Sequence, residues 1–162
     1  MYHLLSTGGA CVKLKFRFEL EGEIVEAEIP EDLYYHPDHC WARVEDGKVR
    51  VGFDDFGQVT AGQILFIRLK PAGKEVKQNE TFGTVETGKW VGPLKAPVSG
   101  TIVEVNLEIR TNPSLVNKDP YGKGWLILVN PSNLEEELKS LITGDAIKAW
   151  IEKEIKERLK KK

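Results

Sequence analysis

Apolar and charged residues alternate near the start of the chain. From residue 12 to residue 20 every second residue is apolar and those between are charged, which is the period-two pattern of a half-buried β-strand. Glu21-Gly22 can turn the chain, and the alternation resumes over residues 25–29. The pattern predicts an N-terminal β-hairpin extension over residues 1–29, which needs a surface to pack on because an isolated hairpin is only marginally stable.

The middle of the chain contains short apolar segments separated by turn residues. Asp46-Gly47 marks a hairpin, and the segments predicted as strands are residues 41–44, 48–53, 63–69, 82–87, 91–98 and 125–129. GQILFIRL at 62–69 is echoed by GTIVEVNL at 100–107, with glycine, isoleucine and leucine in matching places. The echo indicates two similar β halves, so a sandwich or flattened barrel is predicted over residues 30–130.

Capping residues predict short helices between these strands. Asp54 or Asp55 can cap a helical turn that ends at Gly62, and Asn112-Pro113 can start another that ends near Asn117. Such turns are too short to form a helical layer. The region therefore remains a mainly β domain.

Residues 131–162 are predicted to form C-terminal helices. Ser132 and Glu135 match a capping box, Gly144 stops the first helix, and Asp145 can cap the next. One apolar stripe follows the second helix: Ile147, Trp150, Ile151, Ile155 and Leu159. We expect this stripe to pack on the β domain rather than to bind a partner.

A hairpin presenting one lysine is predicted at residues 82–98, FGTVETGKWVGPLKAPV. Gly88 can adopt a positive φ in the turn, while Pro93 and Pro97 suit an edge strand better than a central one. Lys89 would then stand at the apex, open to solvent. Taken alone, a lysine in a turn is most often only a solvated side chain.

Composition narrows the class of protein. A chain of 162 residues with 41% hydrophobic content can form one main core, and 23 basic against 25 acidic residues exclude the one-signed field of a nucleic-acid binder. No apolar run long enough for a membrane span and no signal-peptide pattern are present, so a cytoplasmic location is expected. Cys11 and Cys40 form no CxxC motif and are expected to be free thiols.

Several motifs in a fixed order carry a resemblance to a known family. They are IPEDLYYHPDHCWARV (29–44), VGFDDFGQVTAGQI (51–64), TVETGK (84–89), APVSGTIVEVN (96–106) and NPSLVNKDPYGKGWL (112–126). Through these motifs and the two helices after them, the chain resembles the H protein of the glycine cleavage system. The resemblance implies a lipoyl-domain-like hybrid barrel-sandwich, α+β overall once the hairpin and helices are included.

The resemblance also implies a role for Lys89, which would carry lipoic acid through an amide. The protein would be a non-catalytic carrier of the aminomethyl group of glycine on a swinging arm. Its implied partners are a lipoate ligase or lipoyl transferase, glycine decarboxylase, aminomethyltransferase and dihydrolipoyl dehydrogenase, with no nucleic acid and no membrane. The residues expected to support Lys89 are Glu86, Gly88, Trp90, His39 and Cys40. Glu86 either serves recognition by the ligase or the partners or is only a solvated charge on a strand.

The sequence departs from the family pattern at two acids that hold the aminomethyl cation. The family's His-Glu-Trp reads His39-Cys40-Trp41, and Pro93 stands four residues past the lysine. GKWVGP is similar instead to the lipoate-binding proteins of heterodisulfide-reductase-like sulfur oxidation, whose subunits would then be the partners. In that alternative Trp90 and Cys40 line the resting place of a sulfur-loaded arm. The simpler interpretation of Cys40 is a small buried hydrophobe.

Other classes of function find less support. A biotin carrier usually places its lysine between methionines, and the only methionine here is Met1. An unmodified scaffold would not need Lys89, and no nucleophile with a placed base indicates an enzyme. Pro37 breaks any helical face that His36 and His39 could share, so no metal site is predicted.

Overall fold

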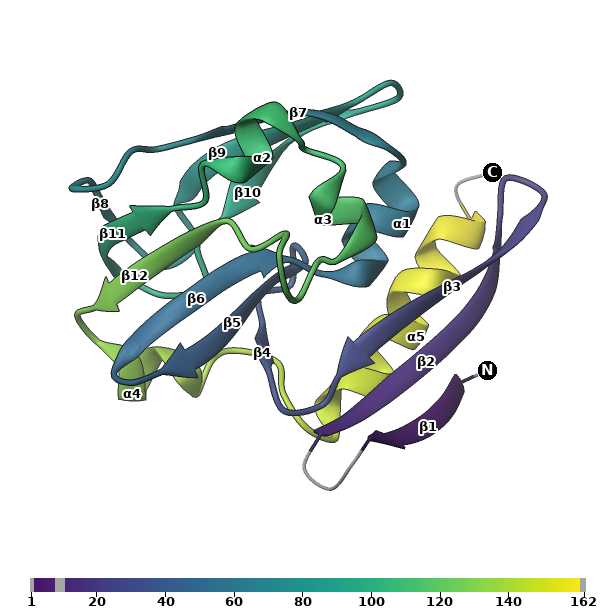
Figure 1. Cartoon of the computed structure of the whole chain (residues 1–162). Helices are drawn as coiled ribbons and strands as arrows, with labels where there is room; N and C mark the ends of the chain where they lie inside the picture. The colour runs from purple at the N-terminus through teal and green to yellow at the C-terminus, as the bar shows by residue number, and fades with distance from the viewer. Residues whose placement is uncertain (1, 8–10, 161–162) are drawn as a thin grey trace.

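The computed structural model describes residues 2–7 and 11–160, with side chains from Val12 to Arg158. Within these residues the chain forms three antiparallel β-sheets and five helices (Figure 1). The mainly β character predicted from the alternating pattern is confirmed.

The first sheet contains three strands, where the alternation predicted two. Its strands, in the order β1-β2-β3, are Tyr2–Thr7, Cys11–Leu20 and Glu23–Pro30. The turn between β2 and β3 is the predicted one, with φ of 52° at Glu21 and 86° at Gly22, as a two-residue hairpin turn requires. The prediction missed β1 because its residues, YHLLST, do not alternate.

The largest sheet has six strands in the order β4-β5-β6-β12-β11-β8. Their bounds are Tyr34–Tyr35, Cys40–Glu45, Lys48–Phe53, Ile127–Pro131, Gly100–Val105 and Glu75–Val76. The β5–β6 turn at Asp46 and Gly47 has φ of 49° and 79°, so the hairpin predicted there is confirmed. The last strand was predicted from residue 125 but begins at Ile127.

The third sheet carries the lysine hairpin, in the order β10-β9-β7. Its strands are Val91–Lys95, Thr81–Thr87 and Ile64–Leu69. β10 is an edge strand, as its prolines predicted, because no strand is paired on its other side among the described residues. The two echoing segments form β7 in this sheet and β11 in the six-stranded sheet, and buried side chains of both sheets share one core.

The helices are short except the last one. They are α1 (Asp55–Ala61), α2 (Glu108–Thr111), α3 (Leu115–Lys118), α4 (Leu134–Leu138) and α5 (Ala146–Lys160). Asp54 caps α1 by accepting a hydrogen bond from Gly57 N, and Gly62 ends it with φ of 92°, as predicted. Asn112 instead ends α2, which was not predicted, and α3 begins three residues after it.

The capping box predicted for α4 is wrong. Asn133 is the N-cap, without a side-chain cap bond, and Ser132 N bonds Ser99 O across the fold. The helix ends early because Ile142 leaves it to exchange backbone hydrogen bonds with Tyr35. Tertiary contacts therefore override the local helix signal.

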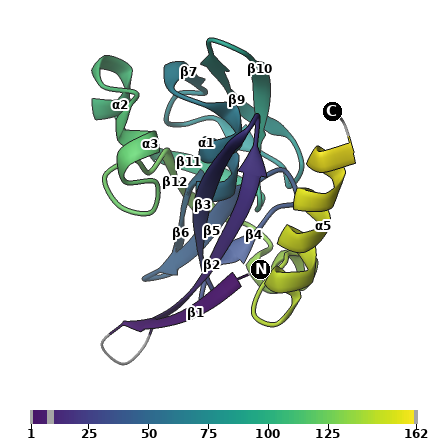
Figure 2. The ribbon, with the colours of Figure 1, turned by 90° about the vertical axis from the view of Figure 1, so that its right-hand side faces the viewer.

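A second apolar cluster joins the N-terminal sheet to α5, which lie against each other in both views (Figures 1 and 2). Its fully buried members include Phe16, Ile29, Phe56, Ile147 and Ile151. The stripe of α5 thus packs within the molecule, but its surface includes the N-terminal sheet and not only the β domain on which it was expected to pack. The Leu159 side chain lies outside the described residues. The N-terminal sheet is docked and not a free appendage.

Candidate functional site

Lys89 lies at the tip of the β9–β10 hairpin, beyond the last strand pair, Glu86 and Val91. Its side chain is 55% exposed, and its Nζ lies 2.9 Å from Glu21 Oε2. A Cβ placed on Gly62 would lie 3.4 Å from Lys89 Cε, so the lysine stem passes over the end of α1. The predicted position of the amine, exposed at the tip of a bend, is confirmed.

The turn is fixed by Thr87, not by Gly88. Thr87 N donates to Trp90 O at 2.8 Å, and Thr87 Oγ1 accepts from the backbone N–H groups of Lys89 and Trp90 at 3.2 and 3.1 Å. Gly88 does not adopt a positive φ, so the prediction for its backbone is wrong. The Thr87 hydroxyl closes the loop through local side-chain to backbone bonds, and a left-handed residue is not needed.

A cavity of about 480 Å³ opens beside Lys89. Its walls come from the β2–β3 turn, the loop before β5, α1, the lysine hairpin and α5. The residues that line it include Glu21, Asp38, His39, Lys89, Trp90, Pro93, Glu154 and Arg158. Segments far apart in the sequence therefore meet around the lysine, with apolar side chains near the hairpin and charged side chains near α5.

Trp90 forms an aromatic wall of this cavity. Its indole, 42% exposed, lies over Gly92, where an added Cβ would overlap the ring. Gly92 therefore makes room for the tryptophan to lie along its own hairpin beside Pro93. The sequence interpretation that Trp90 borders the space next to the lysine agrees with this geometry.

His39 is held from both sides by carboxylates. Its Nδ1 lies 3.0 Å from Asp54 Oδ2 and its Nε2 lies 2.6 Å from Glu154 Oε1. The ring stacks between Phe56 and Trp150, with centroid distances of 4.9 and 4.8 Å. His39 thus ties α5 to the N-terminal end of α1 at the floor of the cavity.

These contacts set the charge of His39. Burial by itself lowers the pKa of the imidazole, but attraction to Asp54 and the hydrogen bonds to Asp54 and Glu154 outweigh it and raise the pKa to about 9. The hydrogen bond from His39 in turn lowers the pKa of Glu154. At neutral pH the cluster is an imidazolium between two carboxylates.

Cys40 lies away from this cavity. It is fully buried in the core, it forms no disulfide, and burial raises the pKa of its thiol. The interpretation of Cys40 as a small buried hydrophobe therefore fits better than a role beside the arm. The Cys11 side chain is outside the described residues.

His36 is occupied locally and is kept neutral. Its Nε2 lies 2.7 Å from Asn79 Oδ1, its Nδ1 accepts from Asp38 N at 2.9 Å, and burial lowers its pKa. Among the side chains that the structure describes, no group of three or more His, Cys, Asp and Glu is placed to hold a metal ion.

Glu86 lies on the outer face of the sheet formed by β10, β9 and β7. It pairs across the strands with Phe66 and Val91, and these two apolar side chains are 61% and 64% exposed. The three form a row next to the lysine turn, since directly opposite residues of an antiparallel sheet point to the same face. A protein approaching Lys89 from this side meets a carboxylate between two exposed apolar groups.

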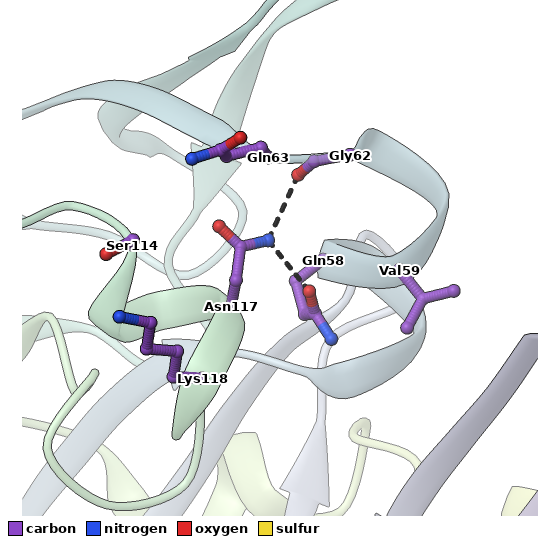
Figure 3. Close-up of a pocket in the computed structure, with 7 residues that line it drawn as sticks. All are labelled: Gln58, Val59, Gly62, Gln63, Ser114, Asn117 and Lys118. Carbon is purple, nitrogen blue, oxygen red and sulfur yellow. Dashed lines mark hydrogen bonds between the residues drawn. The ribbon is translucent and has the colours of Figure 1, made fainter.

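A second hollow, of about 460 Å³, lies between the end of α1 and α3 (Figure 3). Asn117 crosses it, donating to Gln58 Oε1 and Gly62 O and accepting from Ile64 N. These bonds use the amide fully for holding the end of α1. Asn117 therefore joins α3 to the end of α1, over which the Lys89 stem passes.

The sequence interpretation missed the partners of His39. Asp54 was identified only as a cap, and Glu154, Arg158 and Glu21 were not singled out. One signal was available: Trp150, Glu154 and Arg158 follow at intervals of four, which places them along one line of α5. That this line faces His39, from the far end of the chain, depends on tertiary packing.

A rigid β scaffold that exposes one lysine at a hairpin tip defines a carrier domain of the lipoyl type. Residues 33–154 match the family model described as "Glycine cleavage H-protein". The "Glycine cleavage system H protein 2" of Aquifex aeolicus is 46% identical over 132 residues, 78% of this chain and 82% of that protein. The H protein of Salinibacter ruber is 47% identical over 119 residues, 74% and 95% respectively.

A solved structure agrees with these relatives. The crystal structure of a glycine cleavage system H protein from Mycobacterium marinum superposes with a TM-score of 0.62 at 36% identity, covering 68% of this chain and 97% of that one. The chain belongs to the glycine cleavage H-protein family. Proteins of this family are non-catalytic carriers with lipoate bound covalently to a lysine, and they work with glycine decarboxylase, aminomethyltransferase and dihydrolipoyl dehydrogenase. The fold predicted for the chain is therefore confirmed.

Proposed function

We propose that Lys89 is the residue through which this lipoyl carrier holds its lipoate. The observation that carries the proposal is the exposed Lys89 amine at the tip of a turn that Thr87 fixes, beside a cavity. Lys48 and Lys74 also lie at turns, but neither lines that cavity. Attachment at Lys89 gives the arm both solvent access and a place to fold back.

The residues around the cavity fit the hydrocarbon chain of a lipoyl arm. Trp90 and Pro93 offer apolar surface to its hydrocarbon chain, while His39 with Glu154 keeps α5 in place as the opposite wall. Lipoate supplies a disulfide that accepts a fragment and returns as a dithiol to be reoxidised. The protein's own part is presentation, because tethering raises the local concentration of the arm at each docked enzyme.

A lipoate ligase or lipoyl transferase must reach Lys89 before the carrier can work. The row Phe66, Glu86 and Val91 beside the turn offers such an enzyme a carboxylate flanked by apolar side chains. Gly88 leaves the approach open, since nothing lies within 4 Å of a Cβ placed there. We assign Glu86 to this recognition.

Intact mass of protein produced in a lipoylating host tests the attachment site. We expect one lipoyl addition on the wild-type chain and on Lys74→Arg, which changes a turn lysine elsewhere. Lys89→Arg should show none. A lipoyl addition that persists in Lys89→Arg would assign the modification to another lysine.

The cargo is tested separately on the lipoylated protein. The aminomethyl group of glycine is the cargo expected from the family, and glycine–bicarbonate exchange with glycine decarboxylase measures it. The Trp90 wall of the cavity supports a sulfur cargo. Cys40 does not support it, because Cys40 is buried in the core. Loading from a persulfide donor without glycine exchange would reverse this choice.

We propose that the carrier works in the cytoplasm together with these partner enzymes. Among the described residues no helix is both long and apolar enough to cross a membrane.

A further inference from the structure

The β2–β3 turn of the N-terminal sheet reaches the lysine hairpin. Glu21 Oε2 lies 2.9 Å from Lys89 Nζ, and the two side chains are 66% and 55% exposed. Glu21 also lines the cavity beside Lys89. It lies outside the family match, which spans residues 33–154. A segment that the family match does not cover thus supplies a direct contact to the proposed modification site.

The carboxylate is delivered by a well-anchored element. β2 and β3 pair in unbroken register from Lys13 with Pro30 to Leu20 with Glu23, so the turn lies at the end of a continuous ladder. The ladder is attached to the main body through Tyr121, whose hydroxyl donates to Glu28 O at 2.6 Å and accepts from Asp55 N at 2.9 Å. The meeting of Glu21 with Lys89 therefore follows from the docking of the whole sheet.

Acylation changes what Glu21 meets. Lys89 presents an ammonium while it is free. When its nitrogen bonds the carbonyl carbon of an activated acyl donor, the donor's activating group leaves and two protons of the ammonium pass to solvent. The amide nitrogen carries no charge, so the attraction to the Glu21 carboxylate is lost.

We propose that the β2–β3 turn is a gate at the entrance of the cavity, and that its mobility depends on whether Lys89 is modified. Glu21 holds the free amine at the entrance of the cavity, and acylation releases the turn. The inference rests on lipoylation at Lys89. Its consequence is that the unmodified and the modified carrier present different N-terminal turns to their partners, although the scaffold is the same.

Amide hydrogen exchange of residues 18–24 tests the gate in the full-length protein. Lys89→Arg keeps a cation at the tip and should protect these amides like the unmodified wild type. Lys89→Gln and the lipoylated protein should exchange roughly 1.5- to 5-fold faster, the range for loss of an exposed ion pair. The difference should disappear near 1 M salt, where such pairs are screened.

Two carboxylates of the same hairpin provide the matched control. Glu21→Gln should remove the response to Lys89→Gln, whereas Glu23→Gln, a nearby exposed position that also loses one charge, should keep it. Equal exchange in Lys89→Arg and Lys89→Gln would overturn the gate. Absence of lipoylation in the mass measurement would instead count against the proposed function, and the Arg–Gln comparison would still decide the gate.

Discussion

His39 combines backbone and electrostatic features that are costly in isolation. It has φ of 73°, which few residues other than glycine adopt, and it is a charged group with only 7% of its side chain exposed. Asp54 and Glu154 compensate the charge, and two aromatic rings hold the imidazole between them. Strained residues that persist in this way cluster at functional sites, and His39 borders the cavity of the arm.

The free energy of unfolding should fall as pH rises above neutrality. The pKa of His39 is about 9 in the folded protein against 6.5 for the free side chain, so the stabilisation is complete below pH 6.5 and is lost as pH rises through 9. The full loss is about 3 kcal/mol. Urea unfolding between pH 6.5 and 8.5 should record about 2 kcal/mol of this loss. The rest is lost above pH 8.5, where burial keeps the Cys40 thiol protonated in the folded protein while the thiol of the unfolded chain ionises and adds to the fall.

Variants of His39 provide the control for this dependence. His39→Gln should show a flat profile over the same range and lower stability by about 3 kcal/mol at pH 6.5, because the buried Asp54 and the half-buried Glu154 lose their charged partner. A wild-type profile as flat as that of the variant would contradict the raised pKa.

The lysine turn should respond to Thr87 more than to Gly88. Thr87→Val removes the hydroxyl that accepts from two backbone N–H groups, so we expect a loss of about 1 kcal/mol in stability and slower lipoylation. Gly88→Ala should leave lipoylation unchanged, since its φ is not positive and its surroundings are open. Intact-mass time courses with a lipoate ligase measure both, and faster lipoylation of the Thr87 variant than of the Gly88 variant would refute this account.

The parts of the site close to one another in sequence could be predicted, and the distant parts could not. A turn with one lysine between two β segments is a local pattern, which is why Lys89 and Trp90 were found. Glu154 reaches His39 across 115 positions, and Glu21 reaches Lys89 across 68. No local spacing encodes such pairs, because they depend on how separate elements pack.

At the scale of elements, α5 contributes more than its position at the end of the chain implies. It buries Ile147 and Ile151 against the N-terminal sheet and supplies Glu154 and Arg158 to the cavity. The guanidinium carbon of Arg158 lies 5.3 Å from the centroid of the Phe56 ring, which also stacks on His39. One helix therefore serves the second core and the wall of the site together.

Truncating the buried face of α5 should disturb both. Ile151→Ala is expected to lower the free energy of unfolding by about 2–5 kcal/mol, the range for deletion of buried aliphatic groups. Lys156→Ala, on the exposed face of the same helix, should change it by less than about 0.5 kcal/mol. Urea denaturation compares the two, and similar small effects would show that α5 is not packed as described.

Element type was predicted best where turn chemistry and alternation agreed. Glu21-Gly22 and Asp46-Gly47 identified two hairpins because a two-residue turn needs positive φ at both positions. The first C-terminal helix, predicted from the capping box at Ser132 and the stop at Gly144, is shorter because Glu137 accepts a hydrogen bond from Ser99 N and Ile142 pairs with Tyr35. The sequence motif for a cap was present, but long-range hydrogen bonds determined the backbone.

At the scale of the molecule, the N-terminal sheet completes the second core. A chain that starts at residue 31 would leave Tyr35, Phe56 and Ile147 without the apolar face that covers them. We expect this truncated chain to bind the dye ANS and to unfold at a clearly lower urea concentration. Arg17→Ser, on the exposed face of the sheet, should leave unfolding nearly unchanged. Full stability of the truncated chain would make residues 1–30 a dispensable addition.

The central place of β12 has a consequence for biosynthesis. β12 is inserted between β6 and β11, so the six-stranded sheet consists of two separate pieces until Ile127–Pro131 has left the ribosome. The nascent chain must carry the unpaired edge of β6 from Phe53 until Ile127 is made, and pairing across so many residues is slow. We infer that the six-stranded sheet completes its native pairing only after Ile127–Pro131 has emerged, so the lysine hairpin stands on a finished scaffold only from that point on.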